Sequence, residues 1–225
     1  MRMTSPADTT RKTQPIIIWA GGGHGHVVID IIREQGGWEV VGIIDNLHPR
    51  GASIMGIPVL GDADQLPRIR AAGVDQLVVA IGHCSTRATL LEQAVQLGFQ
   101  TPNIIHPSSI ILPSAQLGTG CVLCPLSVIG AQTRLGRGVI VNTRASIDHD
   151  NVIGDFVHVA PAATLCGFVT VGAESWIGAG AVVRDHLTIG ARAMVGAGAT
   201  VVKHVPDNVT VYGNPATPAK KDSSP

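Results

Sequence analysis

A repeat of six residues runs through the second half of the chain and restricts its fold more than any other feature. Every sixth residue from Ile105 to Val201 is Ile, Leu or Val, at seventeen successive positions. This hexapeptide pattern is typical of parallel β-helices, in which the aliphatic side chain of each hexad points into a triangular prism. We therefore expect residues 104–219 to form an all-β domain, a left-handed parallel β-helix with a C-terminal closing segment.

Two further positions of the hexad support this interpretation. The residue four places after each aliphatic is usually small, as at Ser127 and Ala145, and should fill the space beside the aliphatic. The residue directly after the aliphatic is often Gly, as at Gly130, and we expect it to serve the corner, where the backbone turns sharply. Three hexads make one coil, so residues 18 apart should stack along the prism.

The first half of the chain alternates strand-like and helix-like segments. Apolar runs at 16–19, 40–44 and 77–81 indicate strands, and a helix-like segment follows each of them, the second of these segments at 63–72. The order β-α-β-α-β-α favours a small parallel sheet that binds ligands at the carboxyl ends of its strands. We expect residues 16–103 to form a Rossmann-like α/β domain, preceded by a disordered leader at 1–15.

The composition of the 225-residue chain argues against several classes of function. Lys+Arg and Asp+Glu are both 16, so the formal net charge is zero, which argues against nucleic acid or an anionic membrane as the main partner. No apolar run approaches the roughly 18 residues that span a bilayer, so we expect no membrane insertion. Four Cys in a chain of this length do not make a disulfide framework, and they fit a reducing, cytoplasmic setting.

One histidine stands between two carboxylates in the repeat. His149 lies between Asp148 and Asp150, and Gly167 should stack one coil later. A carboxylate beside an imidazole favours the protonated ring and strengthens it as a general base. For the Asp-His-Asp sequence alone, the alternative is a solvated polar corner. The surrounding repeat favours the base, because β-helices of this kind are mostly acyl-transfer scaffolds.

A column of small residues follows a different corner of the predicted prism. Its members are Pro161, Ala179 and Ala197, again 18 residues apart. Such a column allows a long thin ligand to lie against the backbone. His158 comes just before the corner that begins the column, and it is either a ligand contact or a histidine of the surface or of an interface.

Metal and thiol chemistry receive less support from the sequence. A zinc site of three histidines in a trimeric β-helix should show two histidines five residues apart, a spacing that is absent. His186 and His204 are 18 apart and should stack, but no third ligand comes from the same coil. Cys121 takes a small inward position, and Cys124 and Cys166 have no paired base. We expect neither a metal nor a covalent acyl-enzyme.

A glycine-rich loop, Gly21–Gly25, follows the first predicted strand and precedes a helix. Its backbone amides and the helix dipole can hold a diphosphate. A plain tight turn is the alternative, because the loop does not match the strict dinucleotide fingerprint. Asp45 and Asn46 end the second predicted strand, and Gly82 ends the third. These strand ends should converge at one edge of the sheet, so together they predict a nucleotide pocket.

The combination of these features resembles one family of enzymes. An N-terminal strand, a Gly-Gly-His-Gly loop, a short Rossmann-like domain and a hexapeptide β-helix with Ser-x-x-His-[Asp/Glu] are similar to the nucleotide-aminosugar N-acetyltransferases of the bacillosamine and perosamine type. The related sialic acid O-acetyltransferases share this architecture. The resemblance runs from Ile16 to Ala219. It implies an enzyme of bacterial glycan biosynthesis that uses acetyl-CoA to acetylate a nucleotide-linked amino sugar, with a 4-amino-4,6-dideoxyhexose as the expected sugar.

The resemblance also implies an assembly and roles for individual residues. The enzyme would be a homotrimer with active sites between subunits. His149 would take a proton from the sugar amine, and Asp150, where the family often has Glu, would be its acidic neighbour. His158 would lie beside the thioester and the pantetheine arm. The CoA groove would be lined by the backbone of Gly167, Ala179 and Ala197.

The same resemblance assigns the acceptor site to the first half of the chain, with residues 16–103 as a nucleotide-sugar-binding domain. Two alternatives stay open. One is O-acetylation of a sialic-acid-type sugar, in which the base activates a hydroxyl. The other is a non-catalytic trimeric accessory subunit, which an intact His149–Asp150 pair disfavours. The implied diphosphate loop contains Gly22, Gly23 and His24, and the implied nucleotide and sugar contacts are Asp45, Asn46 and Gly82.

Overall fold

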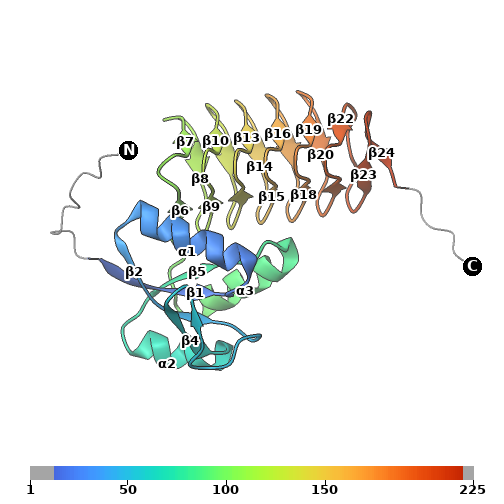
Figure 1. The fold of residues 1–225 in the computed structure, drawn as a ribbon. Helices are drawn as coiled ribbons and strands as arrows, with labels where there is room; N and C mark the ends of the chain where they lie inside the picture. Colours follow the sequence, from blue (N-terminus) through green and yellow to red (C-terminus); the bar gives the residue numbers. More distant parts are fainter. Residues whose placement is uncertain (1–12, 220–225) are drawn as a thin grey trace, which may run out of the picture.

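The structure is a computed structural model that describes residues 13–219 (Figure 1). An α/β part at the N-terminus packs against the start of a long β-helix, whose coils continue from there toward the C-terminus. Both predicted fold classes are confirmed. Residues 1–12 of the predicted leader lie outside the described residues, and the first strand already begins at Gln14.

The α/β part contains a five-stranded sheet of order β3-β4-β2-β1-β5, parallel except for the β3–β4 pair. Alternating residues of the first strand, between β2 and β5, are buried on opposite faces. Ile16 and Ile18 pack with the first helix, whereas Ile17 and Trp19 pack with the two later helices. The elements are β1 (Gln14–Trp19), α1 (Gly23–Gln35), β2 (Trp38–Ile44), β3 (Ser53–Ile54), β4 (Ile57–Gly61), a 3-10 turn (Ala63–Gln65), α2 (Leu66–Ala71), β5 (Gln76–Val79) and α3 (Cys84–Gln96).

In the β-helix each hexad forms one two-residue strand, and paired strands of successive coils are 18 residues apart. The strands are β6 (Ile104–Ile105), β7 (Ile110–Ile111), β8 (Gln116–Leu117), β9 (Val122–Leu123), β10 (Val128–Ile129), β11 (Arg134–Leu135), β12 (Ile140–Val141), β13 (Ser146–Ile147), β14 (Val152–Ile153), β15 (His158–Val159), β16 (Thr164–Leu165), β17 (Thr170–Val171), β18 (Trp176–Ile177), β19 (Val182–Val183), β20 (Thr188–Ile189), β21 (Met194–Val195), β22 (Thr200–Val201), β23 (Thr210–Tyr212) and β24 (Thr217–Pro218).

These strands form the three walls of the prism. We call them the docking sheet (β6, β9, β12, β15, β18, β21, β23 and β24), the upper sheet (β7, β10, β13, β16, β19 and β22) and the third sheet (β8, β11, β14, β17 and β20). The chain passes from the docking sheet through the first corner to the upper sheet, and then through the second corner to the third sheet. The α/β part lies against the docking sheet, where Val28 and Ile31 of α1 share a core with Ile104, Val122 and Ile140.

The interior of the prism agrees with the six-residue period. The inward aliphatics from Leu123 to Val201 form one buried core, and the small positions beside them, such as Ala145 and Ala163, are fully buried. Because each coil adds side chains of the same kind at the same places, the core continues without a break along the helix axis.

Among the described residues, no helix is long and apolar enough to cross a membrane.

The corners differ from the prediction in the role of their glycines. Left-handed backbone occurs three residues after the aliphatic, as at Asp150 (φ 56°) and Gly180 (φ 66°), and not at the position directly after it. The glycines at that earlier position face the next coil instead. A Cβ on Gly118 would lie 2.7 Å from the carbonyl oxygen of Gly136. These glycines are therefore needed because the coils stack closely, and the sharp turn itself lies two residues further on.

Candidate active site

The predicted base and its acidic neighbour form a hydrogen-bonded pair at the second corner. His149 follows β13, and its Nδ1 lies 2.9 Å from Oδ2 of Asp150. The carboxylate can only accept, so Nδ1 carries the hydrogen and Nε2 is the basic nitrogen. The two side chains are 48% and 38% exposed, respectively. The left-handed backbone of Asp150 turns its carboxylate back toward the ring of the preceding residue.

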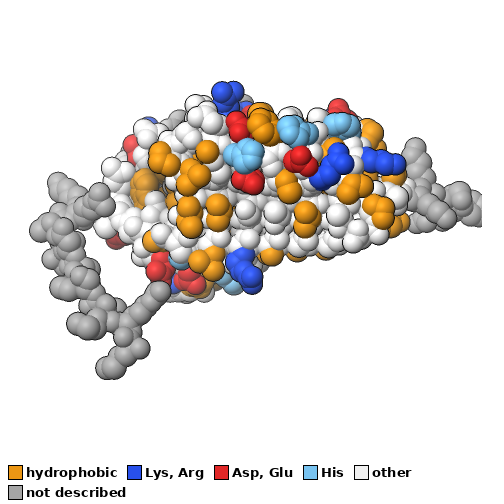
Figure 2. All heavy atoms as spheres, turned by 90° about the horizontal axis from the view of Figure 1, so that it is seen from above, with side chains coloured by type: hydrophobic (Ala, Val, Ile, Leu, Met, Phe, Trp, Pro, Cys, Tyr) orange, Lys and Arg blue, Asp and Glu red, His pale blue; other side chains and the backbone are white. Residues whose placement is uncertain are grey.

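The predicted stacking of His149 on Gly167 is confirmed. A Cβ on Gly167 would lie 2.7 Å from Nε2 of His149, so any larger residue would displace the ring. The edge of the ring also meets Phe168 at 5.3 Å between ring centroids, and Phe168 in turn stacks on His186 at 4.7 Å. Figure 2 shows histidine and charged side chains gathered along one edge of the β-helix, beside a surface of mainly hydrophobic and uncharged side chains.

A pocket of about 520 Å³ opens at the carboxyl edge of the α/β sheet. Apolar side chains such as Ile44, Ile81 and Leu90 form much of its wall, and Gln93 adds an amide. The strand ends and the glycine loop therefore converge as the sequence predicts. All six residues predicted to contact the nucleotide sugar line this pocket: Gly22, Gly23, His24, Asp45, Asn46 and Gly82.

The glycines of the loop fall into two groups. A Cβ on Gly21 would meet the side chains of Ile54 and Ile43, and a Cβ on Gly25 would lie 2.5 Å from a backbone carbonyl oxygen. These two glycines are required by the packing. Gly22 and Gly23 have no atom within 4 Å of a built Cβ, and they precede and begin α1. The unpaired amides of this 13-residue helix thus face an open pocket, where an anion is stabilised.

The carboxylate of Asp45 is occupied by the loops around it. It accepts hydrogen bonds from the backbone of Gly21 (2.7 Å), Leu47 (2.7 Å) and His48 (3.0 Å), and from the His48 ring. Burial raises the pKa of Asp45, but these hydrogen bonds outweigh burial and hold the pKa below its usual value. Asp45 therefore ties the glycine loop to the end of β2, and Asn46 is the exposed polar side chain beside it.

Two histidines lie between the pocket and the β-helix. His158 is only 4% exposed, because it lies under the α/β part. Its Nδ1 donates to the carbonyl of Gly82 (3.1 Å), and its Nε2 accepts from the amide of Asn142 (3.1 Å). Burial, together with the positive charge of Arg87, lowers the pKa of His158 to about 3 and that of His24 to about 4, so both rings are neutral. Nε2 of His24 is buried without a hydrogen-bond partner among the described residues.

The predicted column of small residues occupies the first corner. Pro161, Ala179 and Ala197 are all exposed, and hydrogen bonds from Gly180 to Pro161 (2.9 Å) and from Gly198 to Ala179 (2.8 Å) connect the successive coils. The left-handed residues at this corner, Gly180 and Gly198, carry no side chain either. The corner therefore presents bare backbone over two coils, as a groove for an extended ligand requires.

Within one chain the parts of the candidate site do not meet. His149 and Gly167 are at the second corner, between the upper and the third sheet. Ala179 and Ala197 are at the first corner, across the upper sheet, and the α/β part is on the docking sheet (Figure 1). The His149–Asp150 pair of one chain consequently faces away from the pocket at the carboxyl edge of the α/β sheet of the same chain.

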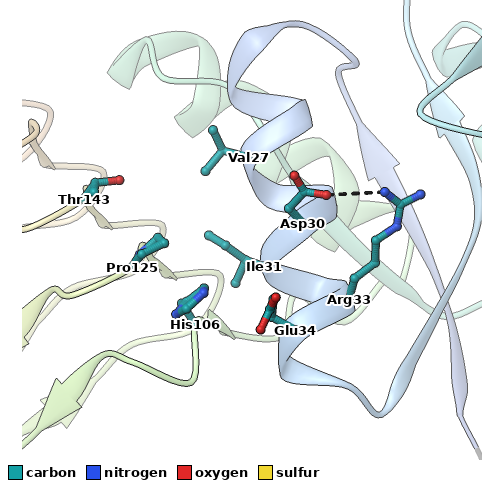
Figure 3. A pocket seen from close by; sticks show the side chains of 8 residues that line it. All are labelled: Val27, Asp30, Ile31, Arg33, Glu34, His106, Pro125 and Thr143. Atoms are coloured by element: carbon teal, nitrogen blue, oxygen red, sulfur yellow. Dashed lines mark hydrogen bonds and ion pairs between the residues drawn. The ribbon is translucent and has the colours of Figure 1, made fainter. Parts of the chain in front are cut away.

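A larger hollow of about 640 Å³ lies between α1 and the first corner (Figure 3). Charged side chains of α1 form one wall, including an Asp30–Arg33 pair at 3.3 Å, and Pro125 and Thr143 form the other. None of the residues that the sequence marks for chemistry lines it. The features that the sequence predicts for a nucleotide site, a helix N-terminus and three strand ends, converge instead at the smaller pocket.

Two of the four thiols, those of Cys121 and Cys124, lie at other corners than the His149–Asp150 pair. Cys121 takes its predicted inward position and is fully buried, and Cys124 is fully buried on the docking sheet. Burial raises the pKa of the two thiols to about 11 and about 12, so both are protonated at neutral pH. Among residues 13–219, no three His, Cys, Asp or Glu side chains converge as metal ligands would.

Comparison with known proteins shows relatives over nearly the whole chain. Residues 15–94 match the model of the PglD N-terminal domain, and residues 168–203 match that of six bacterial transferase hexapeptide repeats. PerB from Caulobacter crescentus, crystallised with CoA and GDP-perosamine, is 39% identical, with a TM-score of 0.88 over 93% of this chain and 99% of that one. The chain belongs to the hexapeptide-repeat aminosugar N-acetyltransferases.

Two further solved structures are similar to this chain over most of its length. The acetyltransferase domain of PglB from Neisseria gonorrhoeae, in complex with acetyl coenzyme A, is 38% identical, with a TM-score of 0.87 over 92% of this chain and all of that one. WeeI from Acinetobacter baumannii is 31% identical, with a TM-score of 0.84 over 92% of this chain and all of that one. A comparison with curated protein sequences gives no match.

The acetyltransferase contains a buried cation that the sequence analysis missed. Arg87 of α3 is fully buried, and it donates to five backbone carbonyls. Two belong to the loop after β5, at Ile81 and Gly82, and the others belong to two coils of the β-helix. Arg87 thus joins the edge of the nucleotide pocket to the β-helix. A single Arg in an amphipathic helix gives no sequence sign of burial, because most such residues are exposed.

Proposed function

We propose that this acetyltransferase moves the acetyl group of acetyl-CoA to the amino group of a nucleotide-linked amino sugar, a 4-amino-4,6-dideoxyhexose, for the synthesis of a bacterial glycan. The observation that carries the proposal is the His149–Asp150 pair on the bare backbone of Gly167. It occurs in a chain 39% identical to an enzyme crystallised with CoA and GDP-perosamine, which represent the donor and acceptor of such a reaction.

The geometry of the pair fits direct transfer between the two substrates. The amine nitrogen attacks the thioester carbonyl carbon, and Nε2 of His149 accepts the proton that the amine loses. Asp150 holds Nδ1–H and so keeps Nε2 turned outward. A C–N bond forms, the C–S bond breaks, and CoA leaves as a thiolate that takes up a proton. Holding both substrates in one cleft lowers the barrier further, because the reacting atoms no longer have to meet by diffusion.

The separation of the site parts supports a homotrimer. A contact that brings the second corner of one copy to the first corner of the next is head-to-tail, and three such contacts close a ring. The upper sheet lies between these corners and presents an uncharged outer row that includes Ile110, Val128 and Val182. In this arrangement the base of one copy meets the nucleotide pocket of its neighbour, and the active site is complete only in the assembly.

The two parts of the chain then hold different substrates. Residues 16–103 hold the nucleotide sugar, with the diphosphate at the amides of Gly22 and Gly23 and the base against the apolar wall. Residues 104–219 hold acetyl-CoA along Ala179 and Ala197, with Gly167 beside the base. His158 lies beside the acyl donor, and its ring holds the edge of the pocket through the hydrogen bond to the carbonyl of Gly82.

A valine at position 23 tests the nucleotide assignment. Gly23→Val places a branched side chain at the N-terminus of α1, where no protein atom lies within 4 Å of the new Cβ. The fold should survive, and the KM for the sugar nucleotide should rise by about tenfold or more, equal to about 1.4 kcal/mol, because the phosphate can no longer reach the amides. Steady-state kinetics for both substrates and a melting curve measure this effect.

His26→Val is the matched control for that experiment. It adds the same side chain at an exposed position of α1 that does not line the pocket. Its sugar-nucleotide KM should stay at the wild-type value. A folded Gly23→Val protein with a normal sugar-nucleotide KM would remove the glycine loop from the binding site.

A bulky residue in the first corner tests the acetyl-CoA groove. Ala197→Tyr should raise the KM and the Kd for acetyl-CoA by about tenfold, equal to about 1.4 kcal/mol, because the ring fills space above the bare backbone. The exposed position accommodates the ring without disturbing the core. Calorimetric titration with acetyl-CoA measures the affinity directly. Ala191→Tyr, at a corner outside the proposed groove, should leave that affinity unchanged, and equal affinities in both variants would refute the groove.

The proposed reaction is tested by steady-state assays with acetyl-CoA and a panel of GDP-, UDP- and dTDP-linked 4-amino sugars. We expect an N-acetylated product with at least one acceptor, and the same acceptor should raise the melting temperature, since a ligand that binds only the native state stabilises it. Acetylation of a sialic-acid-type hydroxyl instead, or no transfer to any acceptor, would overturn the proposal.

The four free cysteines fit an enzyme of the reducing cytoplasm.

A further inference from the structure

Asn151 is a fully buried polar side chain directly inside the corner that carries the base. It lies four residues after the inward aliphatic Ile147, in the position that holds a small residue in most hexads, such as Ala145 and Ala163. A buried amide is stable there only if its donors and acceptor are all bonded. Its hydrogen bonds therefore show what the residue does.

The amide of Asn151 holds the backbone of two successive coils. Nδ2 lies 2.8 Å from the carbonyl oxygen of Asp148, 3.1 Å from that of His149 and 3.0 Å from that of Cys166 in the next coil. Oδ1 accepts from the backbone N–H of Val169 at 3.1 Å. The Asn151 side chain thus hydrogen-bonds, from the interior of the prism, the loop that carries His149. It also hydrogen-bonds the next coil on both sides of Gly167.

These contacts fix the surface on which the imidazole rests. The ring of His149 lies against Gly167 with no room for even a methyl group. The spacing between the two coils at this corner therefore sets the position of Nε2. Thr133 extends the arrangement to the preceding coil, since its Oγ1 donates to the carbonyl of Asp148 at 2.6 Å and accepts from the N–H of Asn151 at 3.2 Å.

We propose that Asn151 is a positioning residue for the base, and that it acts by fixing both the loop of His149 and the coil beneath the ring. The inference rests on the proposed function, in which His149 accepts the amine proton. Without the amide the corner can relax, because each of three carbonyls loses a donor, and among the described residues those of Asp148 and His149 keep only Thr133 and the Phe168 N–H, respectively. A displacement of the base by about 1 Å is enough to slow a reaction by about 10²-fold.

Asn151→Ala tests this role in the intact enzyme. We expect kcat to fall by roughly 10–10²-fold, while the KM values for both substrates change by less than about twofold. Ser175→Ala is the matched control, because Ser175 is equally buried in the same hexad position at another corner. There its Oγ donates to Gly190 (2.6 Å) and accepts from Ala193 (3.0 Å). The control should lose stability and keep its kcat.

A double-mutant cycle separates positioning from a general loss of stability. In the His149→Ala background, Asn151→Ala should cause no further loss of kcat, because the group that it positions is gone. A wild-type kcat in folded Asn151→Ala, or an undiminished loss in the His149→Ala background, would overturn the proposal.

An NMR measurement makes the test independent of activity. The ¹⁵N signals of the His149 ring should show the Nδ1–H tautomer in the wild type and in Ser175→Ala, and should show a mixture of tautomers in Asn151→Ala. An unchanged ring signal in Asn151→Ala would also overturn the proposal. Failure of the wild-type enzyme to acetylate any amine would refute the proposed function instead, and the ring signal would still decide the role of Asn151.

Discussion

Replacement of His149 by alanine should lower kcat by roughly 10²–10⁴-fold, the usual contribution of a general base. The affinity for acetyl-CoA should stay close to that of the wild type, because the ring contacts bare backbone at Gly167 and the proposed groove lies at another corner. Neither the core nor a coil-to-coil hydrogen bond depends on this exposed side chain. Steady-state kinetics with both substrates, together with calorimetric titration of acetyl-CoA, measure the two expectations.

His186→Ala is the control for this prediction. His186 lies at the same corner, and its ring stacks on Phe168, the neighbour of the proposed base. It should show near-normal kcat, because its Nε2 lies 3.8 Å from the nearest carboxylate, that of Asp185, which is too far for the hydrogen bond that orients the His149 ring. A folded His149→Ala enzyme with wild-type kcat would exclude His149 as the base, and equal losses in both variants would point to damage of the corner instead.

Arg87→Met should cause the largest loss of stability among single substitutions considered for this chain. The five carbonyls that Arg87 bonds are in the junction between the two parts, and Met has similar length but no donor. Each buried carbonyl left without a donor costs about 1–3 kcal/mol, so the free energy of unfolding should fall by at least about 3 kcal/mol. Denaturation at a fixed protein concentration measures it.

Arg70→Met controls for the loss of an arginine in the same part of the chain. Arg70 is partly exposed, and within residues 13–219 its side chain bonds only the carbonyl of Gly98, at 3.0 Å. Its stability should change by less than about 1 kcal/mol, as is usual for surface positions. In Arg87→Met the sugar-nucleotide KM should also rise, because Gly82 at the pocket edge loses one of its two donors. Equal stability of the two variants would show that Arg87 does not join the two parts.

Much of the β-helix could be predicted from the sequence, because each hexad forms the same local structure, a short strand followed by a turn. A coil of fixed length places any residue above the one 18 positions earlier, which is why Gly167 could be placed on His149 without a structure. The place of the pocket at the carboxyl edge of the α/β sheet was also predictable, since parallel strands end at one edge of a sheet. In these cases spacing along the chain fixes proximity in space.

The remaining features depend on contacts that spacing does not encode. The burial of Arg87 and His158 results from docking of the α/β part on one wall of the prism, which no local pattern specifies. Asp45 stands where a ligand contact is expected, yet its carboxylate bonds the backbone around it. Asn151 is different, because a large polar residue in a position for small ones was a visible exception to the repeat.

The fixed coil length also limits how the gene for such a protein can change in length. From β6 to β22, paired strands are 18 residues apart, so insertion of a single hexad in this range would turn everything downstream by one wall of the prism. An insertion between Gly167 and Ala179 would move Ala179 and Ala197 to a different corner while His149 stayed in place. Only whole coils preserve the alignment of walls. Evolutionary insertions should therefore occur as loops at the corners or within the α/β part, and the β-helix should grow or shrink by complete turns.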